Sequence, residues 1–267
     1  MRHRQPAICL RAIDYSETSQ VLHFLTRGAG TVRVLGKGTK RPRSKSGGAI
    51  DLLSEGQLLF STGRAQGLAV LLEFTETTCH SALRKEASRL NAAVYMLELI
   101  SAMLAEGDPH AEVFDLLHNA LGRLGHADAP VQAVLAYFQW RLLRHVGLLG
   151  QLSTCVGCGR AIAGQGRGHR HHEQVFFSST QGGLICAGCR HTAGEKLPLG
   201  PQTPQTLAGL AALAAAETGK KVPLADRRAR AVNRMLAYHV AQQIGRWPKM
   251  AKYAIGHQAG MNTDKHG

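Results

Sequence analysis

The chain has 267 residues, of which 44% are hydrophobic and 19% are charged. This composition excludes a wholly disordered chain, and the length favours two or three compact units, each able to bury a core. The 32 Lys and Arg residues outnumber the 18 Asp and Glu residues, giving a formal net charge of +14. Such an excess favours a polyanionic partner, and nucleic acid before a membrane surface.

No stretch is long and apolar enough to span a bilayer, and the N-terminal MRHRQPAICLRAID lacks the pattern of a secretory signal. We therefore expect a cytoplasmic protein with no membrane partner. Thiols stay reduced in that compartment, so the six cysteines indicate metal ligands or buried thiols before disulfides. Cys9 and Cys79 stand among apolar residues, which predicts that both are buried.

Short β-rich bursts of apolar residues run from residue 7 to residue 74, and each has the length of one strand. Glycine-containing breaks at 27–30 and 65–67 are typical of hairpin turns. Five strands predict a closed barrel over residues 1–78, and the OB-fold is the commonest five-stranded, nucleic-acid-binding form. The bursts are AICLRAI, QVLHFLT, TVRVLG, GQLLFSTG and GLAVLLEF.

From residue 79 the hydrophobic period changes from two to 3.6, which indicates helices. Short breaks between three apolar stripes predict an antiparallel bundle, a helical domain of residues 79–151. The stripes cover residues 90–104, 113–124 and 131–149.

Helix signals resume in residues 198–253, which we expect to complete the helical domain. Thr203-Pro204 is typical of a helix start, and a last amphipathic helix is expected from Asp226 to Arg246. Residues 254–267 are expected to form a disordered tail.

Four cysteines form two C-x-x-C pairs, Cys155 with Cys158 and Cys186 with Cys189. Each pair can bind one tetrahedral metal ion, and an inner glycine lets backbone amides turn toward the sulfurs. We therefore predict one structural Zn²⁺ in a zinc-ribbon-like insert, residues 152–197. Four thiolates leave no open position for a reacting water, so the ion would serve to fold a segment with little core of its own.

C-x-x-C pairs also occur in three other kinds of site. A redox C-x-x-C requires a thioredoxin-like βαβ setting, which the sequence lacks. A zinc deaminase would use His171 and Glu173 with the second cysteine pair, but it keeps an open site and leaves the first pair without a role. An iron–sulfur cluster also takes four thiolates. The nearby histidines are expected at a solvated hairpin tip; they are His169, His171 and His172.

A glycine-rich, basic stretch, residues 36–51, interrupts the strands of the barrel. Its charges cannot be buried, so we expect a mobile cationic arm that binds phosphates; a solvated loop without a partner is the plainer alternative. The basic residues are Lys37, Lys40, Arg41, Arg43 and Lys45.

Aromatic rings are few in this segment, and several should lie in the core, so base stacking is expected to be a minor term. The rings are those of Tyr15, Phe24, Phe60 and Phe74.

Motifs of covalent chemistry are missing. Residues 36–39 fail as a phosphate-binding loop, because Thr31 stands where the first glycine is required and Gly38 where Ser or Thr should follow the lysine. No nucleophile elbow, H-E-x-x-H or kinase signature is present. The sequence thus predicts a protein that is not an enzyme.

Several stretches, spread over most of residues 5–250, carry a specific resemblance. They are DYSETS with FLTRGAGTVRVLGKGTKRPRSK, YMLELISAMLAEGDPHAEVFDLL, FQWRLLRHVGLLGQLSTCVGCGR, and FFSSTQGGLICAGC with RMLAYHVAQQIGR. On these stretches the chain resembles the RecO family of bacterial DNA repair proteins. The stretch 163–173 departs from the family pattern.

The resemblance implies a multi-domain α+β protein: an N-terminal OB-fold barrel, then a helical bundle carrying a four-cysteine zinc site. It further implies a nucleoid-associated recombination mediator that binds single-stranded and duplex DNA and single-strand-binding protein, anneals complementary strands and, with RecR, helps load RecA. The DNA-binding residues it implies are Lys37, Lys40, Arg41, Arg43 and Lys45, with Arg11 and Arg33.

Two other function classes are considered beside this hypothesis. One is a zinc-ribbon nucleic-acid enzyme, such as a deaminase or nuclease accessory. The other is a protein-binding adaptor whose charge serves solubility. Within the leading hypothesis, the acidic stretch 73–125 is a candidate surface for RecR, and the basic residues of 227–249 are a candidate surface for DNA or an acidic peptide.

Overall fold

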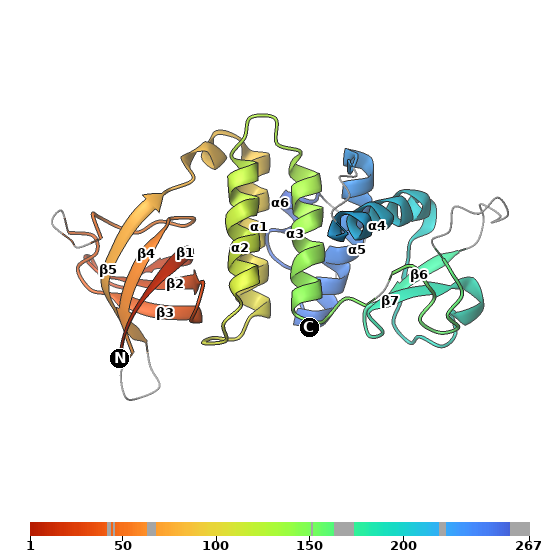
Figure 1. The fold of residues 1–267 in the computed structure, drawn as a ribbon, viewed down its shortest axis with the longest axis horizontal. Coiled ribbons are helices and arrows are strands. Elements are labelled where there is room, and N and C mark those ends of the chain that lie inside the picture. The colour runs from red at the N-terminus through yellow and green to blue at the C-terminus, as the bar shows by residue number, and fades with distance from the viewer. Residues whose placement is uncertain are drawn as a thin grey trace, which may run out of the picture. The chain divides into compact units, whose positions relative to one another are not determined.

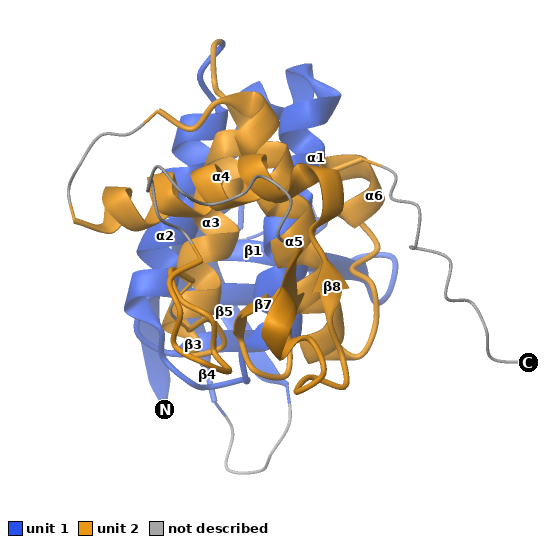
Figure 2. Cartoon of the chain, turned by 90° about the vertical axis from the view of Figure 1, so that its right-hand side faces the viewer, with its two compact units in different colours: residues 1–127 blue, residues 128–267 orange. Residues whose placement is uncertain are grey.

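The computed structural model describes residues 1–41, 44, 46–62, 68–150, 152–162, 174–218 and 223–256. The chain divides into two compact units, residues 1–127 and residues 128–267 (Figures 1 and 2). The first unit contains a five-stranded barrel and two α-helices, and the second contains the remaining helices and a small sheet.

The strands of the first unit close into a barrel in the order β1-β2-β3-β5-β4. All neighbours are antiparallel except β3 and β5, which pair in parallel at Val34–Ala69 and Leu35–Val70. This five-stranded barrel confirms the predicted OB-fold. The strands are β1 (Arg2–Asp14), β2 (Gln20–Thr26), β3 (Gly30–Gly36), β4 (Glu55–Ser61) and β5 (Ala69–Thr78).

Strand β1 begins five residues earlier than its apolar burst predicts. It pairs with β4 through Arg2–Ile8 and with β2 through Ala7–Asp14, so its first five residues have a strand partner on one side only. Pro6 lies in that one-sided part, where the missing N–H of a proline is tolerated.

Inward-facing side chains from all five strands fill the barrel, and the rings of Phe24 and Phe74 pack with centroids 5.3 Å apart. Cys9 belongs to this core, as predicted. The prediction that Cys79 is buried is wrong, because the last four residues of β5 are exposed and Cys79 continues the chain out of the barrel. The predicted turn at 65–67 lies outside the described residues.

The two helices of the first unit are α1 (Ala87–Met103) and α2 (Ala111–Leu124), preceded by the 3-10 helix η1 (Ser81–Lys85). The loop between α1 and α2 lies along the part of β3 that β5 leaves unpaired. Gly107 N donates to Thr31 O at 2.9 Å, and Thr31 Oγ1 donates to Ala105 O at 3.2 Å. An open strand edge is thereby covered from within the chain.

Gly30 makes this close approach possible. Its φ is +68°, and a Cβ placed on it would lie 2.3 Å from the Asp108 carbonyl oxygen. Only glycine combines a left-handed backbone with so little space.

The second unit is built on α3 (Val131–His145), α4 (Thr203–Glu217) and α5 (Asp226–Ile244), with the short α6 (Ala251–Ala254). Helix α5 packs against both α3 and α4. It ends two residues before the predicted Arg246, because Gly245 takes the left-handed conformation that ends many helices (φ 71°). No helix within the described residues is long and apolar enough to cross a membrane.

A buried polar network joins the helices of this unit. Gln139 Nε2 donates to Asn233 Oδ1 at 2.8 Å, Asn233 Nδ2 donates to Gln132 O at 2.9 Å, and Gln132 Nε2 donates to Ala254 O at 2.9 Å. Each buried amide thus has a partner, which avoids the cost of an unsatisfied polar group. Ala254 and Ile255 are buried, whereas residues 257–267 lie outside the described part of the chain.

A small antiparallel sheet, in the order β7-β6-β8, completes the second unit; its strands are β6 (Val175–Ser178), β7 (Gly183–Cys186) and β8 (Leu197–Pro198). It is tied to α5 through Ser179 and His239, both buried. His239 Nε2 donates to Leu148 O at 2.8 Å, which leaves Nδ1 to accept from Ser179 Oγ at 2.7 Å. Burial lowers the pKa of His239, so the ring is held neutral.

Candidate nucleic-acid interface and metal centre

The first part of the basic stretch lies against the turn between β1 and β2. Lys40 N donates to Thr18 O at 3.1 Å, and Gly38 N donates to Ser19 Oγ at 3.4 Å. Thr39 is buried, and its hydroxyl donates to Gln20 Oε1 at 3.1 Å. Residues 37–41 are therefore anchored to the barrel, whereas the sequence predicted a mobile arm. The burial of Thr39 could not be predicted from the charge pattern of this stretch.

Two of the predicted DNA-binding residues, Lys37 and Arg41, line one concavity of about 340 Å³ together with Tyr15. Both cations are exposed, and within the described residues neither forms an ion pair. An unpaired cation beside a concave surface is free to contact a phosphate.

The other predicted DNA-binding residues are placed differently. Lys40 Nζ lies 2.8 Å from Asp14 Oδ2, and an Arg33 nitrogen lies 2.7 Å from Glu106 Oε2. Arg11 is exposed on β1, where it lines a second concavity, of about 640 Å³. Arg43 and Lys45 lie outside the described residues.

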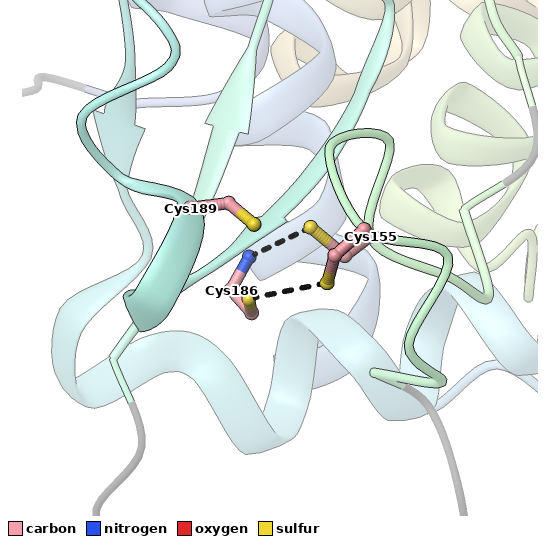
Figure 3. A group of neighbouring side chains, drawn as sticks. Cys155, Cys186 and Cys189 are labelled. Carbon is pink, nitrogen blue, oxygen red and sulfur yellow. Dashed lines mark hydrogen bonds between the residues drawn. The ribbon is translucent and has the colours of Figure 1, made fainter.

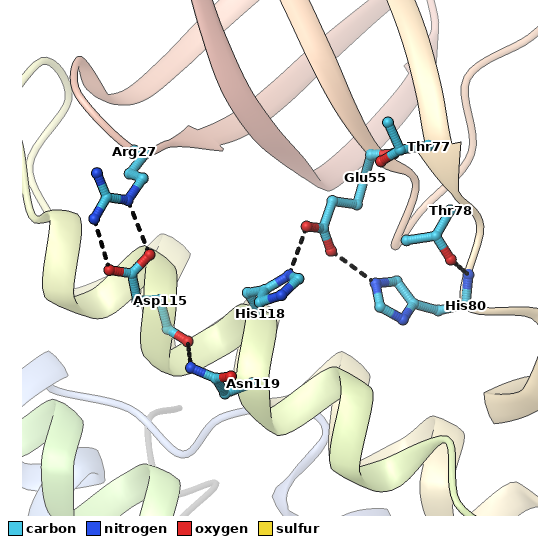
Figure 4. Close-up of polar contacts among 8 residues, drawn as sticks. All are labelled: Arg27, Glu55, Thr77, Thr78, His80, Asp115, His118 and Asn119. Carbon is cyan, nitrogen blue, oxygen red and sulfur yellow. Dashed lines mark hydrogen bonds and ion pairs between the residues drawn. The ribbon is translucent and has the colours of Figure 1, made fainter.

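Two arginines of the barrel are paired with carboxylates from the helical part of the same unit. Arg27 binds Asp115 through two hydrogen bonds of 2.9 and 3.0 Å (Figure 4), and Arg33 Nε donates to Glu106 Oε2 at 2.9 Å. Hydrogen bonds from these guanidinium groups hold the pKa of Asp115 and of Glu106 below their ordinary values. Part of the positive charge of residues 1–45 is thus neutralised inside the unit.

A buried carboxylate, Glu55 at the start of β4, joins three elements, and the sequence analysis missed it. His80 Nε2 donates to Glu55 Oε2 at 2.9 Å and His118 Nδ1 donates to Oε1 at 2.6 Å (Figure 4). Burial alone would raise the pKa of Glu55, but the two histidines outweigh it and hold the pKa below its ordinary value. These histidines lie 25 and 63 positions away in the sequence, so no local spacing reveals the cluster.

In the second unit, the four predicted metal ligands come together. The sulfurs of Cys155, Cys158, Cys186 and Cys189 all lie within 4.8 Å of one another, and Figure 3 shows the labelled cysteines converging from two segments of the chain. The Cys158 and Cys186 sulfurs are 3.8 Å apart. A tetrahedral ion with bonds of about 2.3 Å to sulfur has an edge of about 3.8 Å, which the Cys158–Cys186 pair matches, so the group could hold a metal ion.

Backbone amides near the four cysteines stabilise the thiolate form of Cys155. Burial would raise the pKa of Cys155, but amides of Cys186, Cys158 and Gly157 point at its sulfur and lower the pKa to about 6. Cys186 N, for example, lies 3.4 Å from the Cys155 sulfur. A thiolate is the form that binds a metal, so these amides favour the binding-competent state.

The segment around the cysteines has a small core of its own. Apart from the cysteines, its buried cluster comprises Phe176, Ile185 and Ala193, with Ile162 partly buried. The residues predicted to form a hairpin tip lie outside the described part of the chain, including the H-x-E residues His171 and Glu173 of the deaminase alternative; they are His169, His171, His172 and Glu173.

The fold and the site define the class: a multi-domain α+β protein with an OB-fold barrel, a helical region and a four-cysteine group able to hold a metal ion. The family model "Recombination protein O N terminal" matches residues 1–78, and "Recombination protein O C terminal" matches residues 84–252. The chain belongs to the RecO family.

Individual relatives agree. The "DNA repair protein RecO" of Anaeromyxobacter dehalogenans is 32% identical over 91% of this chain and 93% of its own length. The protein of the same name from Rubrobacter xylanophilus is 30% identical over 89% and 90%, and that from Moorella thermoacetica is 30% identical over 71% and 67%.

Proposed function

We propose that this chain is a non-enzymatic recombination mediator that binds single-stranded DNA at the barrel surface around Lys37 and Arg41. The main support is that some basic side chains of the barrel form ion pairs with carboxylates and others do not. Arg27, Arg33 and Lys40 are bound to carboxylates, whereas Lys37 and Arg41 face one concavity without an acidic partner among the described residues. The loops of OB-fold barrels are the usual sites of oligonucleotide binding.

Family membership supports the partners that complete this function. The mediator would act on DNA coated by single-strand-binding protein, anneal complementary strands and, together with RecR, help load RecA. Duplex DNA would be bound as the product of annealing. Positioning strands against each other requires phosphate contacts and no covalent chemistry, which agrees with a sequence that carries no catalytic motif.

The four cysteines are proposed to hold one structural Zn²⁺. Their sulfurs all lie within 4.8 Å of one another, close enough to share one tetrahedral ion, and four thiolates leave no coordination position for a reacting water. The ion would fold the segment around β6–β8, whose own core is small.

The first test is a salt titration of binding to a single-stranded homothymidine oligonucleotide. Replacing Lys37 and Arg41 together by alanine removes two phosphate contacts, so the slope of log affinity against log salt should become less steep by about 1.4. The factor by which the two substitutions weaken binding should therefore be roughly 25 times larger at 0.1 M salt than at 1 M salt.

Arg123→Ala is the matched control, because Arg123 is an exposed cation at the end of α2 in the same unit. It should leave the slope unchanged. An unaltered slope in the Lys37→Ala/Arg41→Ala variant, or an equal change in the control, would refute this interface. Annealing of complementary strands precoated with single-strand-binding protein is the functional readout, and the double variant should be slower than Arg123→Ala.

A further inference from the structure

Tyr15 is the exposed aromatic residue of the barrel. Its side chain is 70% exposed, whereas Phe24, Phe60 and Phe74 are all buried in the core. A single exposed apolar residue is common on protein surfaces, so a functional role must be inferred from the groups around the ring.

The turn that carries Tyr15 is held in place by the backbone. Tyr15 N and Ser16 N both donate to Ser19 O, at 2.9 and 3.3 Å, and Lys40 N donates to Thr18 O in the same turn. The side chain of Tyr15 does not help to fix the turn in this way, since its hydroxyl makes no hydrogen bond to the part of the chain that the structure describes. The turn thus presents the ring to solvent while its own shape depends on other groups.

The surroundings of the ring suit a nucleotide. Lys37 and Arg41 line the same concavity of about 340 Å³, and Leu35 provides an apolar side chain there. Gly38, between the two cations, has a φ of +69° that turns the chain so both line the concavity. The nearby acid Asp14 is paired with Lys40, and Glu17, exposed in the turn itself, does not line the concavity.

We propose that Tyr15 is a stacking platform for one unpaired base of single-stranded DNA, with Lys37 and Arg41 contacting the phosphates on either side of it. The inference rests on the proposed function and adds a residue that selects single strands. A base in a duplex is covered on both faces by its neighbours, so only an unpaired base can lie on the ring. Stacking is tolerant of sequence, because every base has a π-face.

The test compares Tyr15→Ala with the wild-type chain on three probes of equal length: homothymidine, an abasic oligonucleotide with the same phosphates, and a duplex. Loss of one stacked base should weaken homothymidine binding by about 5-fold to 150-fold. Binding to the abasic strand and to the duplex should change by less than about twofold, and the salt slope should stay that of the wild type, because no phosphate contact is lost.

Two further variants serve as controls. Tyr15→Phe keeps the ring and should bind homothymidine as the wild type does. Tyr253→Ala removes another exposed tyrosine, 57% exposed and in the second unit, and should have no effect on any probe. Because the Tyr15 side chain is exposed, thermal unfolding of Tyr15→Ala should match the wild type.

Unchanged homothymidine binding in Tyr15→Ala, or an equal loss on the abasic strand, would overturn the stacking role. Either result would leave the proposed function intact as long as Lys37→Ala/Arg41→Ala still flattens the salt dependence. If that double variant also behaves as the wild type, the interface itself has been misplaced.

Discussion

Glu55 couples the acidity of a single side chain to the stability of the first unit. It is buried at the start of β4 and accepts hydrogen bonds from His80 and His118. Its pKa in the folded chain lies below the ordinary value, which the unfolded chain retains. The ionised form therefore stabilises the fold fully above the unfolded pKa, and this contribution is lost as the pH falls through the folded pKa.

Glu55→Gln should lower the free energy of unfolding at pH 7 by about 1–3 kcal/mol, because a charged acceptor shared by two imidazoles is replaced by a neutral amide. It should also flatten the decline of stability below about pH 4.5, since the group that takes up the proton is gone. Urea unfolding of both proteins from pH 7 to pH 3.5 measures both effects.

Glu76→Gln, an exposed position on β5, is the control and should follow the wild-type curve. Parallel pH profiles for Glu55→Gln and the wild type would show that the carboxylate does not titrate as its contacts predict.

Which residues could be predicted depends on whether their partners are close in sequence. The two C-x-x-C pairs each place two ligands on one turn, so the metal group was predictable as a set of four. Arg33 pairs with Glu106, 73 positions away, and no spacing rule anticipates it. The same holds for Glu55 with His118. The sequence predicted that several of the four aromatic residues of the barrel lie in the core but did not single out Tyr15 as the exposed one, because exposure depends on where the turn after β1 lies.

Among the secondary-structure elements, those whose pattern is local were predictable. Alternating apolar residues and glycine turns predicted all five barrel strands. A 3.6-residue period predicted α1, α2, α3 and α5, and the start signal Thr203-Pro204 predicted α4. That period gives the buried face of a helix and leaves its partner unspecified. For the stripe at 131–149, the period predicted the helix α3 but could not show that it packs against α5, which lies about ninety residues further along the chain.

The small sheet β6–β8 should depend on metal. Each strand has at most four residues, and the buried cluster beside the cysteines is small. Stripping the ion with a chelator should raise hydrogen exchange across residues 152–198 and leave β1–β5 protected as before. The intact protein should contain about one zinc per chain, and Cys155→Ser or Cys189→Ser should lose it.

Mass-spectrometric hydrogen exchange on the full chain, with and without chelator, resolves the two regions. Serine at Cys9, which is remote from the metal group in sequence and lies in the other unit, should keep the zinc content of the wild type. Unchanged exchange over 152–198 in metal-free protein would show that the hydrogen bonds of Ser179 and His239 suffice to hold the sheet.

For the molecule as a whole, the count of 32 Lys and Arg residues overstates the number of cations available to a polyanionic partner. Arg27 and Arg33 are neutralised by Asp115 and Glu106, acids of the stretch 73–125 that the sequence offered as a partner surface. Exposed ion pairs of this kind add little to the stability of the fold. Their main effect is that the paired cations are less available to a polyanionic partner than the unpaired ones. Lys37 and Arg41 are among the cations without an ion pair in the described residues, and they line the concavity that also holds Tyr15.

The proposed DNA interface and the four-cysteine group lie in different compact units. If the ion serves only to fold its own segment, removing it and removing the two cations should have additive effects on DNA binding. The change in salt slope caused by Lys37→Ala/Arg41→Ala should then be the same in the zinc-bound protein and in the Cys189→Ser background. A salt titration of all four combinations measures this. A smaller change in the metal-free background would mean that the ion also shapes the DNA path, and the metal would then have a role in recognition beyond folding its own segment.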